Sequence, residues 1–207
     1  MVKRSFKILS ATSNEGKARE ISSALRGLSL QILSLKDFPS LHIVEEQGAN
    51  YSENAIAKAT SYAAQTGINA LADDSGLEVD ALGGCPGVHS ARYGGIGVSD
   101  VERNHKLLTS LAPIDTSERA ARFVSIVVLA KPSEDRSLAG CVLAIERGVC
   151  EGKIALTSRG DHGFGYDPIF IPSGYNETFG ELPDSIKRQI SHRAQSLFKM
   201  RTFLEAY

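Results

Sequence analysis

The chain has 207 residues, a formal net charge of -1 at neutral pH and a hydrophobic fraction of 42%. This length predicts one domain, over residues 1–207, that could have two lobes, and the hydrophobic fraction is sufficient for a full core. Proteins that bind the backbone of nucleic acids normally carry a basic surplus, so the balanced charge gives no support to a nucleic-acid partner. No segment has the length of a membrane span, and we expect no membrane partner.

The cysteines give information about the compartment. Cys85, Cys141 and Cys150 lack the spacing of a zinc site or of a disulfide framework, which fits a reducing environment. The apolar run near the N-terminus is too short for a signal peptide. We therefore expect a cytoplasmic protein.

The chain begins with a predicted strand over 6–11, a polar turn over 12–17 and a helix that starts near Lys17. Free backbone N–H groups at the start of a helix, beside a lysine, favour a phosphate ligand. The turn is not a P-loop, because Ala11 and Ala18 stand where that motif has its first glycine and its serine or threonine. An ordinary polar turn with a solvated lysine is the alternative.

A second strand is predicted over 30–35, and a helix rich in alanine over 52–66. The segment 42–50 between them holds Glu45 and Glu46 and reads as a charged loop on the surface.

Two adjacent carboxylates, Asp73 and Asp74, come directly before residues that alternate between apolar and polar from Leu77 to Ala81. The alternation predicts a strand with one buried face that begins after the carboxylates. Two carboxylates at the mouth of such a strand repel each other and require a cation. Oxygen ligands with no nearby histidine or cysteine pair favour Mg²⁺ or Mn²⁺. A solvated Asp-Asp-Ser turn explains the same residues equally well.

The rest of the chain is predicted to hold one helix, then a run of strands, then two helices. We expect a helix over 99–111, strands over 122–130 and 138–146, a third short strand that ends near 156, a strand over 169–171, a helix over 184–187 and a last helix from 191.

Two further polar stretches could contact a ligand. The glycine-rich loop 160–168 carries Phe164 and Tyr166, which could form a stacking surface for a base or could pack into the core. His192 and Arg193 fall in the first turn of the last helix, where the helix dipole disfavours cations. Their placement suggests an anionic or carbonyl-bearing partner, and a solvated arginine beside a hydrogen-bonded histidine is the alternative.

Several motifs, in this order, resemble those of the inosine/xanthosine triphosphate pyrophosphatase family. They are Thr12-x-Asn14-x-x-Lys17, Glu53-Asn54-Ala55 with Lys58-Ala59, Asp73-Asp74-Ser75-Gly76-Leu77, Gly83-Gly84-x-Pro86-Gly87, Ser90-Ala91-Arg92-Tyr93, Gly163-Phe164-Gly165-Tyr166-Asp167-Pro168 and Ser191-His192-Arg193. Each is weak by itself, but together they span nearly the whole chain and are specific.

The resemblance implies an α/β fold with an elongated, mixed and curved β-sheet flanked by helices, and two lobes around a central active-site cleft. It also implies a homodimer. The implied reaction is Mg²⁺-dependent hydrolysis of abnormal purine nucleoside triphosphates, namely ITP, dITP and XTP, to the monophosphate and pyrophosphate. Such an enzyme removes deaminated purines from the nucleotide pool before polymerases use them.

The resemblance also assigns roles to individual residues. Asp74 is the implied proton acceptor, with Asp73 beside it, and Glu45 and Asp74 are the implied Mg²⁺ ligands, with Glu46 as the rival of Glu45 and Mn²⁺ as the alternative metal. The implied substrate-binding residues are Thr12, Ser13, Asn14, Glu15, Gly16 and Lys17 at the triphosphate, Ser75, then Phe164, Gly165, Tyr166 and Asp167 at the base, and Lys187, His192 and Arg193. Ser125 stands where relatives often have cysteine, and we expect it to affect packing only.

Two other functions fit parts of the sequence. A pyrophosphatase of the Maf type, which acts on modified pyrimidine or other nucleotides, is the nearest rival, but the His192-Arg193 pair and the Phe164–Asp167 loop speak against it. A non-catalytic module that binds nucleotides or nucleic acids would need no pair of carboxylates, and the balanced charge does not favour it.

Overall fold

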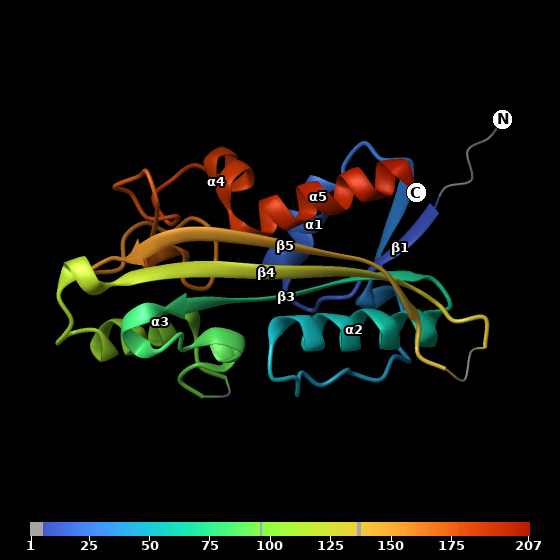
Figure 1. The fold of residues 1–207 in the computed structure, drawn as a ribbon, viewed down its shortest axis with the longest axis horizontal. Coiled ribbons are helices and arrows are strands. Elements are labelled where there is room, and N and C mark those ends of the chain that lie inside the picture. Colours follow the sequence, from blue (N-terminus) through green and yellow to red (C-terminus); the bar gives the residue numbers. More distant parts are fainter. Residues whose placement is uncertain (1–5, 96, 136–137) are drawn as a thin grey trace. The chain divides into compact units, whose positions relative to one another are not determined.

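The computed structural model describes residues 6–95, 97–135 and 138–207 and has an α/β fold (Figure 1). Within this part of the chain, a six-stranded sheet has the order β2-β1-β3-β4-β5-β6. The strands are β1 (Phe6–Ser10), β2 (Leu30–Ser34), β3 (Asn69–Val79), β4 (Ala120–Lys131), β5 (Cys141–Ile154) and β6 (Phe170–Pro172). The helices are α1 (Glu15–Ala24), α2 (Tyr51–Thr66), α3 (Asp100–Ser110), α4 (Asp184–Ile190) and α5 (His192–Ala206).

The sheet is mixed, as the sequence predicts. Strand β1 is parallel to β2 and to β3, whereas β5 is antiparallel to β6. The parallel pairs follow from the helical crossovers in this part of the chain, since parallel neighbours need a long connection. The predicted α/β class, with a mixed sheet and flanking helices, is confirmed.

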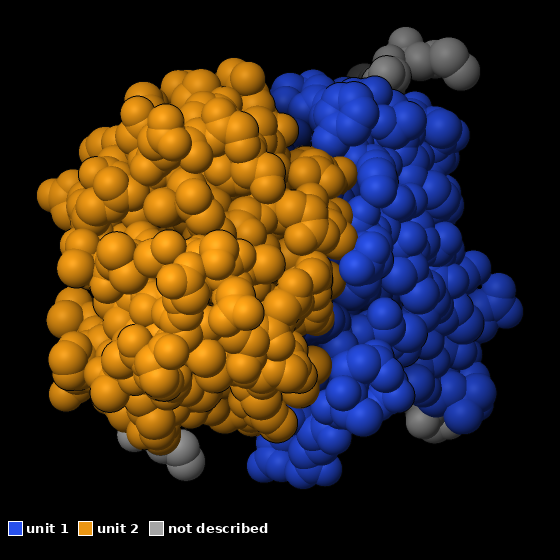
Figure 2. Space-filling view, turned by 60° about the vertical axis from the view of Figure 1, so that its left-hand side comes forward, with its two compact units in different colours: residues 1–74, 125–147, 196–207 blue, residues 75–124, 148–195 orange. Residues whose placement is uncertain are grey.

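The chain divides into two compact units, coloured blue and orange in Figure 2. Unit 1 comprises residues 1–74, 125–147 and 196–207, and unit 2 comprises residues 75–124 and 148–195. The chain passes from unit 1 to unit 2 within β3, between Asp74 and Ser75. The predicted cleft between two lobes stays a prediction.

Unit 1 has a core between its sheet and two helices. Ile21 of α1 and Leu25, which caps its C-terminus, are almost fully buried. They form one cluster with Leu197 and Met200 of α5 and with apolar side chains of β1, β3 and β4. Helix α2 lies on the other side of the strands from α1 (Figure 1). It buries Ala55, Ala59 and Ala63, which lie four residues apart on one face of the helix and allow close packing.

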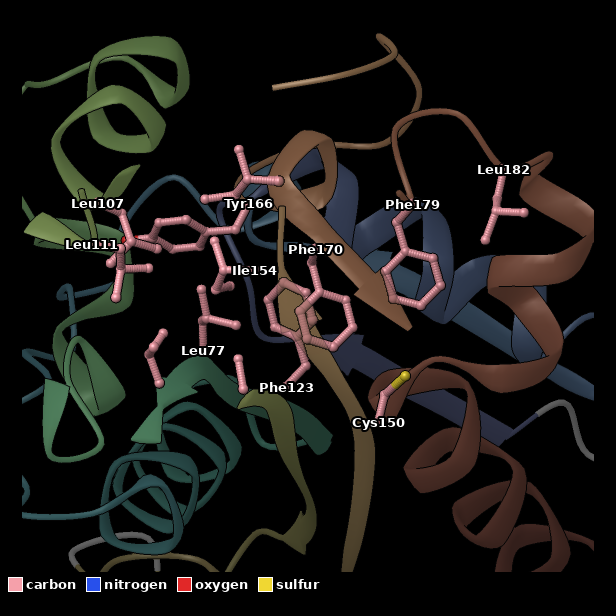
Figure 3. Close-up of a cluster of buried hydrophobic side chains, with 13 residues drawn as sticks. Leu77, Leu107, Leu111, Phe123, Cys150, Ile154, Tyr166, Phe170, Phe179 and Leu182 are labelled. Carbon is pink, nitrogen blue, oxygen red and sulfur yellow. The ribbon is translucent and has the colours of Figure 1, made fainter. Parts of the chain in front are cut away.

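Unit 2 has a separate core that contains a cluster of aromatic rings, shown in Figure 3. The ring centroids of Phe123 and Phe170 are 4.6 Å apart, and those of Phe170 and Phe179 are 5.5 Å apart. Leu107 and Leu111 anchor α3 and its C-terminal end to the same cluster. The core therefore fixes α3 and the 160–168 loop within one unit.

Two predictions about strands are wrong. Strand β3 begins at Asn69, so Asp73 and Asp74 lie inside a strand and not at its mouth, and Ala81 falls in a 3₁₀ turn after it. Ala70, Leu71 and Ala72 are fully buried, and such a continuous apolar run carries no alternation that would reveal the strand. Strand β5 runs unbroken to Ile154 and includes the residues predicted as a third short strand.

The other predicted elements are present with boundaries shifted by a few residues. Among the residues that the structure describes, no helix combines the length and hydropathy needed to cross a bilayer.

Candidate active site

The turn after β1 is organised by its own polar side chains. The Thr12 hydroxyl accepts a hydrogen bond of 3.1 Å from the Asn14 N–H, and the Asn14 side chain accepts one of 3.0 Å from the Lys17 N–H. Asn14 is thereby the N-cap of α1. Glu15 is exposed and pairs with Lys36, so its side chain turns to solvent, whereas Gly16 is buried. The turn places the first N–H groups of a ten-residue helix beside Lys17.

The Asp73 side chain is fully buried and contacts Lys17 and Ser125, both in unit 1. Its Oδ2 atom lies 2.7 Å from the Lys17 ammonium group, and its Oδ1 atom accepts a hydrogen bond of 2.6 Å from Ser125. The Ser125 hydroxyl also lies 2.9 Å from that of Ser196 on α5. The expectation that Ser125 affects packing only is therefore wrong, because its hydroxyl helps to satisfy a buried carboxylate.

Asp74 lies in a second network formed with α2. Asn54 donates a hydrogen bond of 3.0 Å to Asp74 Oδ2, and the Lys58 ammonium group lies 3.5 Å from Asp74 Oδ1. Lys58 also donates a hydrogen bond of 2.8 Å to the carbonyl oxygen of Asp73 and pairs with Glu46. Asn54 and Lys58 are four residues apart on one helical face, a spacing from which their shared role could have been predicted.

Burial dominates the electrostatics of this network. It raises the pKa of the Asp74 carboxyl, and the positive charges of Lys58 and Lys17 offset this effect only in part. Burial lowers the pKa of Lys58, but the negative charges of Asp74 and Glu46 outweigh it and hold the pKa above its ordinary value. Lys58 is therefore a stable cation beside a carboxylate that would gain from more positive charge.

The two glutamates of the 42–50 loop differ in their surroundings. Glu46 is partly buried and joins the network of Lys58 and Asp74. Glu45 is exposed and accepts a hydrogen bond of 2.6 Å from Gln47. Of the two candidate metal ligands, the structure brings Glu46 and not Glu45 into the group around Asp74.

The carboxylates offer the oxygen donors that Mg²⁺ prefers. Among the described residues, no group of three His, Cys, Asp or Glu side chains is arranged to hold a metal ion by itself. Asp74 and Glu46 are instead bridged by the ammonium group of Lys58. Because Asp74 is buried and incompletely neutralised, the donor set fits a hard cation whose remaining ligands come from a triphosphate or water.

In unit 2, Ser75 contacts Arg193, and both residues are among those predicted to bind the substrate. Arg193 donates a hydrogen bond of 2.6 Å to the Ser75 hydroxyl, and the centre of its guanidinium group lies 5.8 Å from the centroid of the Phe164 ring. The Lys187 ammonium group lies 4.5 Å from the same centroid. Phe164 is partly exposed. Its ring therefore lies among cations, away from the core.

The loop behind Phe164 is fixed by a buried ion pair. Asp167 Oδ2 lies 2.6 Å from the Lys187 ammonium group and accepts a hydrogen bond of 2.8 Å from the Phe164 N–H. Gly163 has a φ of +78°, and a Cβ atom there would collide with Asp167 Oδ2, so this position requires glycine.

Two predicted contact residues have structural roles inside unit 2. The Tyr166 ring packs in the core, and its hydroxyl donates a hydrogen bond of 2.9 Å to the carbonyl oxygen of Ser90. Its ring is therefore no stacking surface. His192 is 4% exposed and stacks on Phe123 with centroids 4.7 Å apart.

The model of the Ham1 family matches residues 8–203. The chain belongs to the Ham1 family. Its relatives include a dITP/XTP pyrophosphatase of Desulforamulus reducens, 43% identical over 199 residues that cover 96% of both chains. A dITP/XTP pyrophosphatase of Thermus thermophilus is 47% identical over 204 residues, which cover 99% of this chain and 93% of the relative.

A solved structure supports the same family. That of a HAM1 protein from Coxiella burnetii is similar with a TM-score of 0.85 at 40% identity, covering 98% of this chain and 100% of that chain. The similarity to this Ham1 protein therefore extends over nearly the whole chain.

Proposed function

We propose that this chain hydrolyses abnormal purine nucleoside triphosphates, namely ITP, dITP and XTP, to the monophosphate and pyrophosphate. One observation carries the proposal. Three successive residues of β3 are engaged by polar partners suited to this chemistry: Asp73 by Lys17, Asp74 by Lys58, and Ser75 by Arg193. The relatives named dITP/XTP pyrophosphatase support the same reaction. The role would be the removal of deaminated purines from the nucleotide pool.

The triphosphate would be bound by the positive groups of unit 1. Lys17 and Lys58 supply two ammonium groups, and the turn from Thr12 to Gly16 supplies backbone N–H groups at the start of α1. Lys17 pairs with Asp73, and Lys58 pairs with Glu46 and Asp74. A triphosphate would compete for these cations and stabilise its own negative charge on them.

A divalent cation, Mg²⁺ or alternatively Mn²⁺, would be held by Asp74 and Glu46, with Glu45 as the second candidate. When bound, it would neutralise phosphate charge and polarise the anhydride. This metal dependence is part of the proposal, and it rests on the oxygen-only donor set around the buried Asp74 carboxylate.

Asp74 would act as the general base. A water oxygen forms a bond to one phosphorus of the α–β anhydride, its proton passes to the Asp74 carboxylate, and the bond from that phosphorus to the bridging oxygen breaks. Burial raises the pKa of the Asp74 carboxyl, which favours proton uptake, and a cation bound to the same carboxylate would act in the opposite direction. Asn54 holds one carboxylate oxygen by a hydrogen bond and so fixes its orientation. Asp73, bound to Lys17 and Ser125, would support the charge balance.

Unit 2 would select the base. Hypoxanthine and xanthine have a carbonyl acceptor at position 6, whereas adenine has an amino donor. The Arg193 guanidinium can donate only, so adenine would leave a donor unsatisfied, at about 1–3 kcal/mol. Phe164, partly exposed beside Arg193 and Lys187, would stack on the purine ring. Guanine shares the 6-carbonyl, so this contact does not reject GTP.

Release of pyrophosphate from a nucleotide panel tests the proposal. The panel contains ITP, dITP, XTP, ATP, GTP and a modified pyrimidine triphosphate, each with Mg²⁺, with Mn²⁺ and with EDTA. We expect turnover of the first three with Mg²⁺ and little with ATP. Preference for the pyrimidine would favour a Maf-type activity, and nucleotide binding without turnover would favour a non-catalytic module. A homodimer and a cytoplasmic location stay predictions of the sequence.

A further inference from the structure

The backbone of Gly165, the residue after Phe164, is bound by two side chains of α3. The Gly165 N–H donates a hydrogen bond of 2.7 Å to Asp100 Oδ2, and the Gly165 carbonyl oxygen accepts one of 3.0 Å from Asn104 Nδ2. Asp100 and Asn104 are four residues apart, so both side chains project from one face of the helix. One residue of the loop therefore has its backbone donor and acceptor fixed by another element of unit 2.

Helix α3 is a rigid support for these contacts. Its N-terminus is closed by a capping box between Ser99 and Glu102, and Leu107 is fully buried in the core of unit 2. Asp100 is also held by an ion pair with Arg103. The atoms that bind Gly165 therefore move with the helix and the core, and a change in their positions would require repacking.

Asn104 has the features of a residue that orients the loop. It is 4% exposed, and its Oδ1 atom accepts no hydrogen bond from the residues that the structure describes. If the amide were reversed, this oxygen would face the Gly165 carbonyl oxygen, so the donor must point toward Gly165. An amide that leaves one buried oxygen unsatisfied stabilises the fold little. Its contribution lies in the single bond that it makes to the loop.

Gly165 in turn fixes Phe164. The Phe164 N–H donates to Asp167 Oδ2, and the Phe164 carbonyl oxygen accepts a hydrogen bond of 3.2 Å from the Asp167 N–H. The backbone of Phe164 is therefore held by Asp167 on one side, and the next peptide is held by α3 on the other. This fixed backbone carries the Phe164 ring, whose centroid lies 4.5 Å from the Lys187 ammonium group.

We propose that Asn104, together with Asp100, is a positioning residue that fixes the backbone of Gly165, the residue after Phe164, and thereby sets the affinity and selectivity for the purine base. This inference rests on the proposed function, in which Phe164 stacks on the base. Asn104 is assigned no contact with substrate, so its effect must pass through the Phe164 ring.

The experiment compares Asn104→Leu, which removes the donor at similar volume, with Leu107→Val on the same helix. Leu107 faces the core, so its variant tests whether loosening α3 is sufficient to produce the effect. For each protein, calorimetry measures the binding of IMP and of pyrophosphate, kinetics give kcat and KM for ITP and ATP, and thermal unfolding gives Tm.

We expect Asn104→Leu to weaken IMP binding and raise KM for ITP by roughly tenfold, the value of one well-placed hydrogen bond, and to lower the ITP/ATP preference. Pyrophosphate binding and Tm should stay near those of the wild type. Leu107→Val should lower Tm without a change in the ITP/ATP preference. Asn104→Asp, which replaces the donor by a carboxylate oxygen facing a carbonyl, should be at least as impaired as Asn104→Leu.

Other outcomes separate the two proposals. If wild-type protein neither binds IMP nor hydrolyses ITP, the proposed function fails. If the wild type does both and Asn104→Leu matches it, the positioning role of Asn104 is overturned while the proposed function stands. Equal losses of IMP and pyrophosphate binding with a lower Tm, or the same change of preference in Leu107→Val, would show a merely structural role and also overturn the inference.

Discussion

The Ser125 hydroxyl donates a hydrogen bond of 2.6 Å to Asp73, whose other carboxylate oxygen lies 2.7 Å from the Lys17 ammonium group. Asp73 is 1% exposed and Ser125 is fully buried, so neither group exchanges this contact for water. A buried ion pair needs such additional hydrogen bonds to offset the loss of solvation. Ser125 is therefore part of the charged network of unit 1.

Removal of this hydroxyl should affect both stability and turnover. Ser125→Ala leaves one oxygen of a buried carboxylate without its donor, so the free energy of unfolding should fall by about 1.5–3 kcal/mol. Denaturant unfolding measures this change, and kcat for ITP should fall with it. Ser196→Ala is the matched control, because Ser196 contacts Ser125 and its effect should be smaller. Equal losses of kcat in both variants would contradict a direct role of Ser125 at Asp73.

Asp74→Asn should abolish most turnover while increasing stability at neutral pH. The loss of a positioned general base should lower kcat by roughly 10²–10⁴-fold. Burial raises the pKa of Asp74, so the folded state holds its proton more tightly than the unfolded state. The contribution of Asp74 to the free energy of unfolding of the wild type therefore falls as the pH rises from 3.8, the ordinary pKa of the carboxyl group, through the raised pKa that it has in the folded state.

Thermal unfolding across this pH range checks the sign of the effect. The Tm of Asp74→Asn should exceed that of the wild type at about pH 8, and the difference should shrink as pH falls toward the ordinary carboxyl range. The wild-type kcat should fall over the same range as Asp74 becomes protonated. A variant that is less stable at high pH, or that turns over ITP normally, would refute this account of Asp74.

Lys17→Ala should weaken triphosphate binding and also destabilise unit 1. The substitution removes the ammonium group that pairs with the buried Asp73 carboxylate, at about 3–5 kcal/mol. The double variant Lys17→Ala with Asp73→Asn should recover much of this stability without recovering KM for ITP. Lys36→Ala is the control, because Lys36 pairs with Glu15 and both side chains are exposed to solvent. Unchanged KM in Lys17→Ala would show that Lys17 is purely structural.

Glu46→Gln should raise the Mg²⁺ concentration required for half-maximal turnover, by roughly tenfold or more. Glu46 shares Lys58 with Asp74, whereas Glu45 is exposed and bound to Gln47. Glu45→Gln, the same change one residue earlier, should have little effect in the same titration. The reverse result would identify Glu45 as the ligand.

Arg193→Ala should lower the preference for ITP over ATP by about tenfold or more, because one donor for the 6-carbonyl is lost. Arg193→Lys should not restore the preference, since an ammonium group cannot reproduce the planar guanidinium that reaches Ser75. The ratio of kcat/KM for the two nucleotides is the measurement. If the ratio is unaltered, Arg193 does not read the base.

Local sequence signals located most elements. The alanine-rich composition of 52–66 and the capping box of α3 predict those helices, and the alternation from Leu77 predicts a strand that overlaps the last residues of β3. They missed the beginning of β3 because Ala70, Leu71 and Ala72 are fully buried, and a continuous apolar run has no period. The resemblance to the inosine/xanthosine triphosphate pyrophosphatase family supplied the candidate residues that such patterns could not identify.

The sequence by itself determined the residue types of the chemistry: two adjacent carboxylates, a lysine at a helix start, and an aromatic in a glycine-rich loop. Only the tertiary structure decided which partners they take. Ser125 reaches Asp73 across 52 residues, and Asn104 reaches Gly165 across 61. Hydrogen bonds and ion pairs act over a few ångströms in space, and the separation of two residues along a chain carries no information about that distance until the strands and helices have packed.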